Sequence, residues 1–189
     1  MIKIKIFNPL AGKNRISFQG FVAMRDMLRD YSIELTESDD FDYAFLGADD
    51  ILNKSIGLQE SIEYGLANID KYARGGDCFI FDGSDSTSLM GSYEVLEQSD
   101  AKFLFKNQIL KNREDYKEKT SFNKWFFGNG SDLDLGYDIP KENWDRIKLS
   151  GWNLGYMAPQ GFRPQVQTWH PPNPNKTIDL SAIYSGNHP

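Results

Sequence analysis

One polar run, at positions 82–88, holds the residues best suited to chemistry, and it joins an apolar stretch to a helical pattern. It reads Asp82-Gly83-Ser84-Asp85-Ser86-Thr87-Ser88. The first amides of the expected helix are free to bind an anion or a polar ligand. Asp, Ser and Thr also cap ordinary helices, but a single cap accounts for Asp85 or Ser86 and not for the whole run. We therefore predict Asp82 and Asp85 as candidate catalytic residues, with Ser84 and Ser86 binding substrate.

Apolar strand patterns alternate with helical patterns on both sides of this run. Because helices separate the strands, the connections are βαβ crossovers, which the handedness rule turns into a mostly parallel sheet. The predicted fold class is α/β, doubly wound and Rossmann-like, with helices on both faces. The expected strands are 2–7, 33–35, 43–46, 78–81 and 103–105, and the expected helices are 18–31, 58–73 and 87–98.

The chain divides into three predicted parts. Residues 1–157 form the Rossmann-like domain, whose last strand we expect near 152–156. Residues 158–177 are rich in proline and read as a linker or an extended strap. Residues 178–189 hold a final strand, which either returns to the sheet or opens a second domain that is missing. We favour a missing second domain, because a proline-rich linker is normally followed by a folded unit and seldom by a short tail.

Ligands of parallel sheets bind outside the carboxyl ends of the strands. The segments that follow the predicted strands therefore supply further candidates for substrate binding. These are Asn8, Gly12, Gly47, Lys106 and Asn107.

Charge and composition exclude several classes of partner. The formal net charge is -6, whereas nucleic acids and anionic membranes attract basic surfaces. Cys78 is the single cysteine, so an internal disulfide is impossible and a reducing, cytoplasmic location is expected. No run approaches the roughly 18 apolar residues of a membrane helix. We expect a soluble protein with no nucleic-acid partner and no membrane span.

Three motifs suggest other chemistries. The segment 8–13 lacks the second glycine and the Lys-Ser/Thr pair of a P-loop, but resembles the Asn-Pro-x-x-Gly opening of diacylglycerol and sphingosine kinases. The Gly-Gly-Asp at 75–77 precedes its strand instead of following it, so a lipid-kinase-like phosphotransferase is a minor alternative. The segment 81–87 resembles the nucleophile strand of haloacid-dehalogenase phosphatases, but Ser84 replaces the second aspartate.

Metal ligation has little support in the sequence. Asp132-Leu133-Asp134 matches the metal-binding Asp-x-Asp of one class of glycosyltransferase, a triplet that often arises by chance. His170 and His188 have no partner at ligand spacing. We expect neither a metal nor a cofactor.

Several segments together resemble the N-terminal half of bacterial and viral glycosyltransferases of the two-Rossmann-domain (GT-B) type. The similar segments are Phe81–Leu89, Gly91–Val95, Leu104–Gln108 and Arg113–Lys117, and Ile178–Gly186 resembles the strand that opens their second domain. The resemblance implies that this half presents a sugar or other hydroxyl-bearing acceptor, while a nucleotide-sugar donor binds the second domain. It also implies a general base, for which Asp82 and Asp85 are candidates, and acceptor positioning by Lys106 and Asn107.

Two functions follow as expectations. The first is the acceptor-side domain of a glycosyltransferase, inactive without the donor domain. The second is a non-catalytic Rossmann-like module that binds a small polar or sugar ligand.

Overall fold

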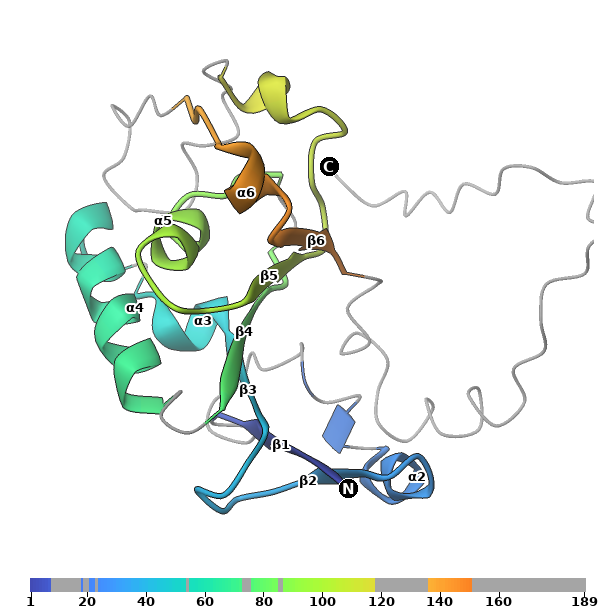
Figure 1. Ribbon diagram of the computed structural model, residues 1–189. Coiled ribbons are helices and arrows are strands. Elements are labelled where there is room, and N and C mark those ends of the chain that lie inside the picture. The colour runs from blue at the N-terminus through green and yellow to red at the C-terminus, as the bar shows by residue number, and fades with distance from the viewer. Residues whose placement is uncertain are drawn as a thin grey trace, which may run out of the picture.

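A six-stranded parallel sheet forms the centre of the molecule (Figure 1). The computed structural model describes residues 1–7, 18, 21–22, 24–53, 55–72, 76–84, 87–117 and 136–150. The strand order is β2-β1-β3-β4-β5-β6, and every neighbouring pair is parallel. The predicted α/β, doubly wound fold is confirmed. The strands are β1 (Ile2–Ile6), β2 (Ile33–Leu35), β3 (Tyr43–Gly47), β4 (Asp77–Asp82), β5 (Phe103–Lys106) and β6 (Ile147–Leu149).

Helices lie on both faces of the sheet, as predicted. The larger core contains Leu46, Ile80 and Leu104 from the strands, packed against residues of α3 (Ala48–Ile51), α4 (Leu58–Tyr72) and α5 (Ser92–Glu97). On the opposite face, Ile4 and Ile6 pack against Leu28 of α2 (Arg25–Asp30). Between β5 and β6 the chain forms η1 (Arg113–Lys117) and α6 (Lys141–Trp144). The central strands β3 and β4 alternate apolar residues toward the two faces and thus contribute to two separate cores.

Opposite charges stand at the ends of the two central strands. Strand β4 begins with Asp77 and ends with Asp82, while Lys102 precedes β5 and Lys106 ends it. The ion pairs Asp77–Lys102, at 3.5 Å, and Asp82–Lys106, at 3.2 Å, join the strands at their two ends. A shift of one residue would move every side chain to the other face, so charge and apolar pattern favour the same register.

Phenylalanines stack across β4 and β5 between these charges. The rings of Phe79 and Phe103 lie 6.0 Å apart and nearly parallel, and those of Phe81 and Phe105 lie 4.9 Å apart. In register, Phe79 faces Phe103 and Phe81 faces Phe105. Cross-strand aromatic pairs of this kind stabilise a sheet beyond the area they bury.

The connection from β2 to β3 is a loop, residues 36–42, and not a helix. It passes beside β1, where Asp39 pairs with Lys5 at 2.5 Å and Asp40 pairs with Lys3. The backbone amide of Asp42 also donates to the carbonyl of Lys3, at 2.9 Å. Since both aspartates are exposed, these pairs fix the path of the loop more than they stabilise the fold.

One predicted element differs from the observed one. The helix expected over 87–98 is the shorter α5, which begins after Gly91 because that glycine has a φ of 83° that few other residues adopt. The last strand of the described sheet is β6 at 147–149, and the strand expected near 152–156 lies outside the described residues. Residues 151–189 lie outside the described residues, and with them the expected linker and final strand.

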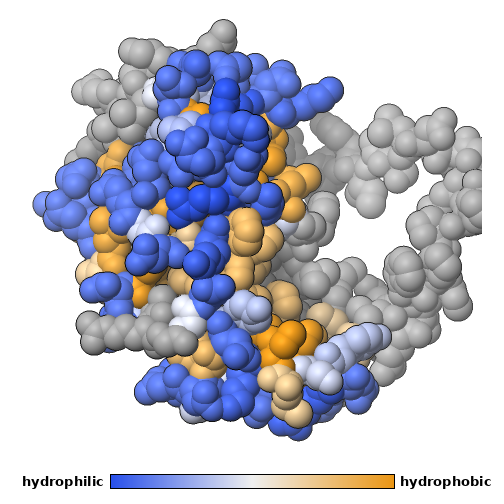
Figure 2. All heavy atoms as spheres, in the orientation of Figure 1, coloured by the Kyte–Doolittle hydropathy of each residue, from blue (hydrophilic) through white to orange (hydrophobic). Residues whose placement is uncertain are grey.

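The surface in the view of Figure 2 is mostly hydrophilic, with hydrophobic side chains gathered along its middle, over the sheet. None of the helices in the described part of the chain is long and apolar enough to cross a membrane.

We predict that Gly65→Leu destabilises the fold by about 1–3 kcal/mol, because a larger side chain overpacks this core. A Cβ at Gly65 would approach Cγ2 of Val95 to 2.8 Å and the carbonyl oxygen of Ile51 to 3.2 Å. Urea unfolding followed by circular dichroism measures the change. The control is Ala67→Leu on the exposed side of α4, and an equal loss in both variants would contradict the close packing.

Candidate functional site

A buried ion pair stands at the carboxyl edge of the sheet. Asp82 is the last residue of β4 and Lys106 the last of β5, and the two face each other in register. The Lys106 side chain has no exposed surface and that of Asp82 is 10% exposed, while Nζ and Oδ2 are 3.2 Å apart. Removing both charges from water is costly unless each is well partnered. The pair thus places two of the predicted site residues in direct contact.

Asp82 holds the start of the following loop and of α5. Its Oδ1 accepts from the backbone amide of Ser84 at 3.0 Å, and its Oδ2 accepts from the hydroxyl of Ser92 at 2.9 Å. Burial by itself would raise the pKa of Asp82, but the charge of Lys106 and the hydrogen bonds from Ser84 and Ser92 outweigh it and lower the pKa. The carboxylate is therefore ionised at neutral pH and is a weak proton acceptor in this state.

Three half-buried polar residues line the rim above the ion pair. The ammonium of Lys106 donates to the hydroxyl of Ser84 at 2.7 Å. The amide of Asn107 donates to the carbonyl of Gly83 at 3.3 Å and accepts from the hydroxyl of Ser150 at 2.8 Å. This chain of bonds fixes a serine hydroxyl and an asparagine amide at the edge where parallel sheets bind ligands. We call Ser84, Asn107 and Ser150 the polar rim.

The other predicted residues fall into two groups. Gly47 ends β3 and pairs with Phe81, so it lies at the same edge, one strand from Asp82. A Cβ at Gly47 would come within 2.9 Å of an Asp50 side-chain oxygen, so a side chain here would require the Asp50 carboxylate to shift. Asn8, Gly12, Asp85 and Ser86 lie outside the described residues.

A second polar cluster supports α5, and the sequence analysis did not identify it. The Glu94 carboxylate accepts from the backbone amide of Gly91 at 2.6 Å and from the hydroxyl of Tyr137 at 2.7 Å. Burial raises the pKa of Glu94, although both hydrogen bonds oppose that shift. The Gly91-x-x-Glu94 spacing supplies the Glu half of a capping box and signals the first contact, although Gly91 has no side chain to bond in return. The Tyr137 contact joins residues 43 positions apart and has no local signal.

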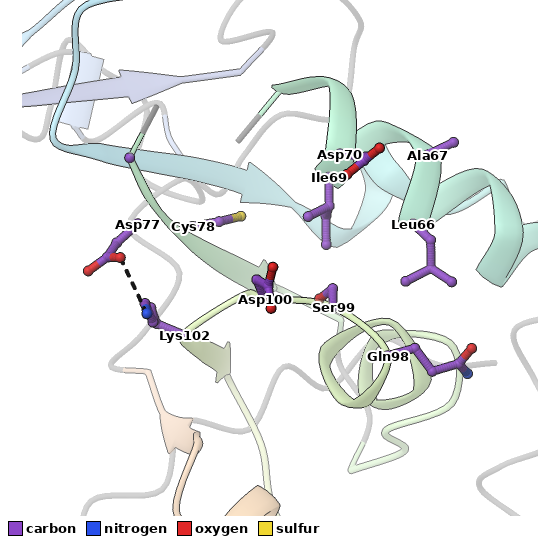
Figure 3. Close-up of a pocket in the computed structure, with 11 residues that line it drawn as sticks. Leu66, Ala67, Ile69, Asp70, Asp77, Cys78, Gln98, Ser99, Asp100 and Lys102 are labelled. Atoms are coloured by element: carbon purple, nitrogen blue, oxygen red, sulfur yellow. Dashed lines mark ion pairs between the residues drawn. The ribbon is translucent and has the colours of Figure 1, made fainter. Parts of the chain in front are cut away.

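A cavity of about 610 Å³ opens at the opposite, amino edge of β4 (Figure 3). Asp77 and Lys102 form their ion pair on its wall, and α4 and the segment after α5 supply much of the rest. Cys78 also lines it, but burial raises the pKa of this thiol to about 12. The thiolate form is therefore scarce at neutral pH, and Cys78 is a poor nucleophile.

Comparison with protein families, curated proteins and solved structures gave no match for this chain. Among the described residues, no group of three or more His, Cys, Asp or Glu side chains is placed to hold a metal ion.

We predict that Lys106→Met lowers the free energy of unfolding by about 3–5 kcal/mol, because it leaves the Asp82 charge buried without its partner. The double variant Asp82→Asn/Lys106→Met regains most of this loss, since neither charge then remains. Urea unfolding at pH 7 measures both variants. A single variant as stable as the parent would contradict a buried, ionised pair.

The lowered pKa of Asp82 also predicts how stability depends on pH. Because the folded state favours the carboxylate, the contribution of Asp82 is present above its ordinary pKa of 3.8 and is lost as pH falls through the lower folded value. The difference in stability between the parent and Asp82→Asn is then largest at pH 5–7 and shrinks toward pH 2. A difference that is constant over this range would contradict the assignment. Urea midpoints at pH 7, 5, 3 and 2 provide the comparison.

Proposed function

We propose that this chain is the acceptor-side domain of a glycosyltransferase that moves a sugar from a nucleotide-sugar donor to a hydroxyl group. The observation that carries the proposal is the polar rim held by the buried Asp82–Lys106 pair at the carboxyl edge of the sheet. On this proposal, the rim binds the acceptor and a second domain binds the donor.

The groups of the rim suit a hydroxyl-bearing ligand. A hydroxyl such as that of Ser84 donates one hydrogen bond and accepts others, and an amide such as that of Asn107 does both at once. Sugar hydroxyls need both kinds of partner. Because Lys106 and Gly83 already hold Ser84 and Asn107, little side-chain freedom is lost when a ligand binds.

The two candidate carboxylates receive different roles on this proposal. Asp82 is committed to Lys106, so it positions the loop and Ser84. Asp85 follows Ser84 in the sequence and is the candidate general base. The base takes the proton of the acceptor hydroxyl as that oxygen attacks the anomeric carbon of the donor sugar, and the nucleoside diphosphate leaves.

A non-catalytic module for a small polar or sugar ligand is the second candidate. The observation that favours it is the state of Asp82, whose two oxygens are engaged and whose pKa is lowered. A rim supported in this way can bind a ligand without any proton transfer.

Saturation-transfer NMR on the whole chain tests the binding common to both candidates. The probes are glucose, galactose, maltose and lactose. We expect a signal from at least one of them, weakened about tenfold in affinity by Ser84→Ala or Asn107→Ala, because a hydrogen bond to the ligand is lost. The control is Ser99→Ala at the opposite edge of the sheet, which leaves the signal unchanged.

The outcomes separate the alternatives. If no saccharide gives a signal, or if Ser99→Ala weakens it as much as Ser84→Ala, the polar rim is not a sugar site. If UDP-glucose displaces the bound saccharide from the rim, the rim takes the donor, which contradicts the acceptor-side assignment.

A further inference from the structure

A second cavity, of about 630 Å³, lies between α4 and the loop 36–42. It is on the face of the sheet that carries α4 (Figure 1), and Lys5 of β1 and Leu46 of β3 belong to its wall. It exists because β2 and β3 are joined by a loop, so no helix of the described chain covers β1 on this side. We call it the β1–β3 cleft.

The cleft adjoins the topological switch point of the sheet, which lies between β1 and β3. The chain leaves β1 toward β2 on one side and leaves β3 toward β4 on the other. In open parallel sheets, the carboxyl ends of two such strands diverge and leave a crevice that binds ligands. Phe7, directly after β1, and Asp50, in the helix after β3, both line the cleft.

Aromatic rings form one wall of the cleft. The rings of Phe7 and Tyr72 are 4.7 Å apart and those of Phe7 and Phe41 are 6.3 Å apart. Phe7 and Tyr72 are only half-buried. The ammonium of Lys5 lies over the Phe7 ring, 5.1 Å from its centroid, and that of Lys71 lies over the Tyr72 ring at 4.6 Å, so a ligand would stack on the ring surface that these side chains leave open. Such rings bind the flat face of another aromatic ring by offset or edge contacts.

Asn68 of α4 also lines the cleft and has an unused donor. Its Nδ2 atom is buried and has no hydrogen-bond partner among the described residues. The last torsion of an asparagine side chain is soft, so the amide can turn toward a ligand. The amide then offers a donor beside an acceptor, the pair that matches the edge of a nucleobase.

The charges of the cleft favour a neutral ligand over a phosphorylated one. Its walls carry three carboxylates, of Glu37, Asp39 and Asp50, and two ammonium groups, of Lys5 and Lys71. Lys5 is held by Asp39, and Lys71 donates to the hydroxyl of Tyr72 at 3.0 Å. Carboxylates accept hydrogen bonds from ribose hydroxyls but repel phosphate.

We propose that the β1–β3 cleft binds a nucleoside, with the base stacked against Phe7 and Tyr72, its edge bonded to the Asn68 amide, and its ribose directed toward the carboxylates. This site is separate from the polar rim and does not depend on the function proposed for it.

Isothermal titration calorimetry of the whole chain with adenosine and uridine tests this site. We expect at least one nucleoside to bind, and Asn68→Leu to weaken it at least tenfold by removing the amide. Asn68→Leu also removes a buried unsatisfied group, so the variant should fold. Tyr72→Leu weakens binding through loss of stacking and gives an independent test. Circular dichroism confirms that each variant is folded.

The control is Ala67→Leu, the neighbouring position on the exposed side of α4, which leaves the affinity unchanged. Absence of binding by both nucleosides overturns the proposal. Glucose binding that disappears in Asn68→Leu also overturns it, because the cleft would then be a saccharide site. Tighter binding of AMP than of adenosine overturns the neutral-ligand assignment. Loss of saccharide binding at the polar rim changes none of these outcomes.

Discussion

The pairing of β4 with β5 is constrained by charge, and the candidate site at the carboxyl edge of the sheet depends on that pairing. Two acidic residues end one apolar strand and two lysines flank the other, so the strands fit in one register. At the amino edge the ion pair is exposed and contributes little. At the carboxyl edge Lys106 is fully buried and requires Asp82. The strand pair thus ends in a polar edge, which contacts β6 and α5.

The two regions that we propose as binding sites differ in their chemistry. At the polar rim, the buried charges are paired within the protein, Lys106 donates to the Ser84 hydroxyl, and the Gly83 carbonyl accepts from the Asn107 amide. In the β1–β3 cleft, half-buried aromatic rings line an open volume beside Asn68, whose buried Nδ2 has no hydrogen-bond partner among the described residues. The polar groups of the first region thus bond to one another. The second region has an open volume, because a loop takes the place of a covering helix.

The sequence predicts most of the sheet but little of what fixes the site. Alternating Ile and Phe residues indicate strands because side-chain direction alternates with period two. Strand β6 (Ile147–Leu149) was not predicted as a strand, because three residues give only a weak periodic signal. Asp82 and Lys106 could each be proposed from their place after a strand. Their contact, and that of Glu94 with Tyr137, depends on the order of strands, which local patterns do not contain.

Strands β4 and β5, each with like charges at its two ends, also affect how the unfolded chain behaves. Cys78–Phe81 and Phe103–Phe105 are uncharged, apolar and free of proline, as the segments of cross-β fibrils are, although each is shorter than the six or seven residues typical of such segments. If either segment stacked on copies of itself in register, two columns of like charge would form at its ends and repel. Only the native partner brings opposite charges together. The four flanking residues therefore stand where gatekeeper residues stand in other proteins, at the ends of apolar segments.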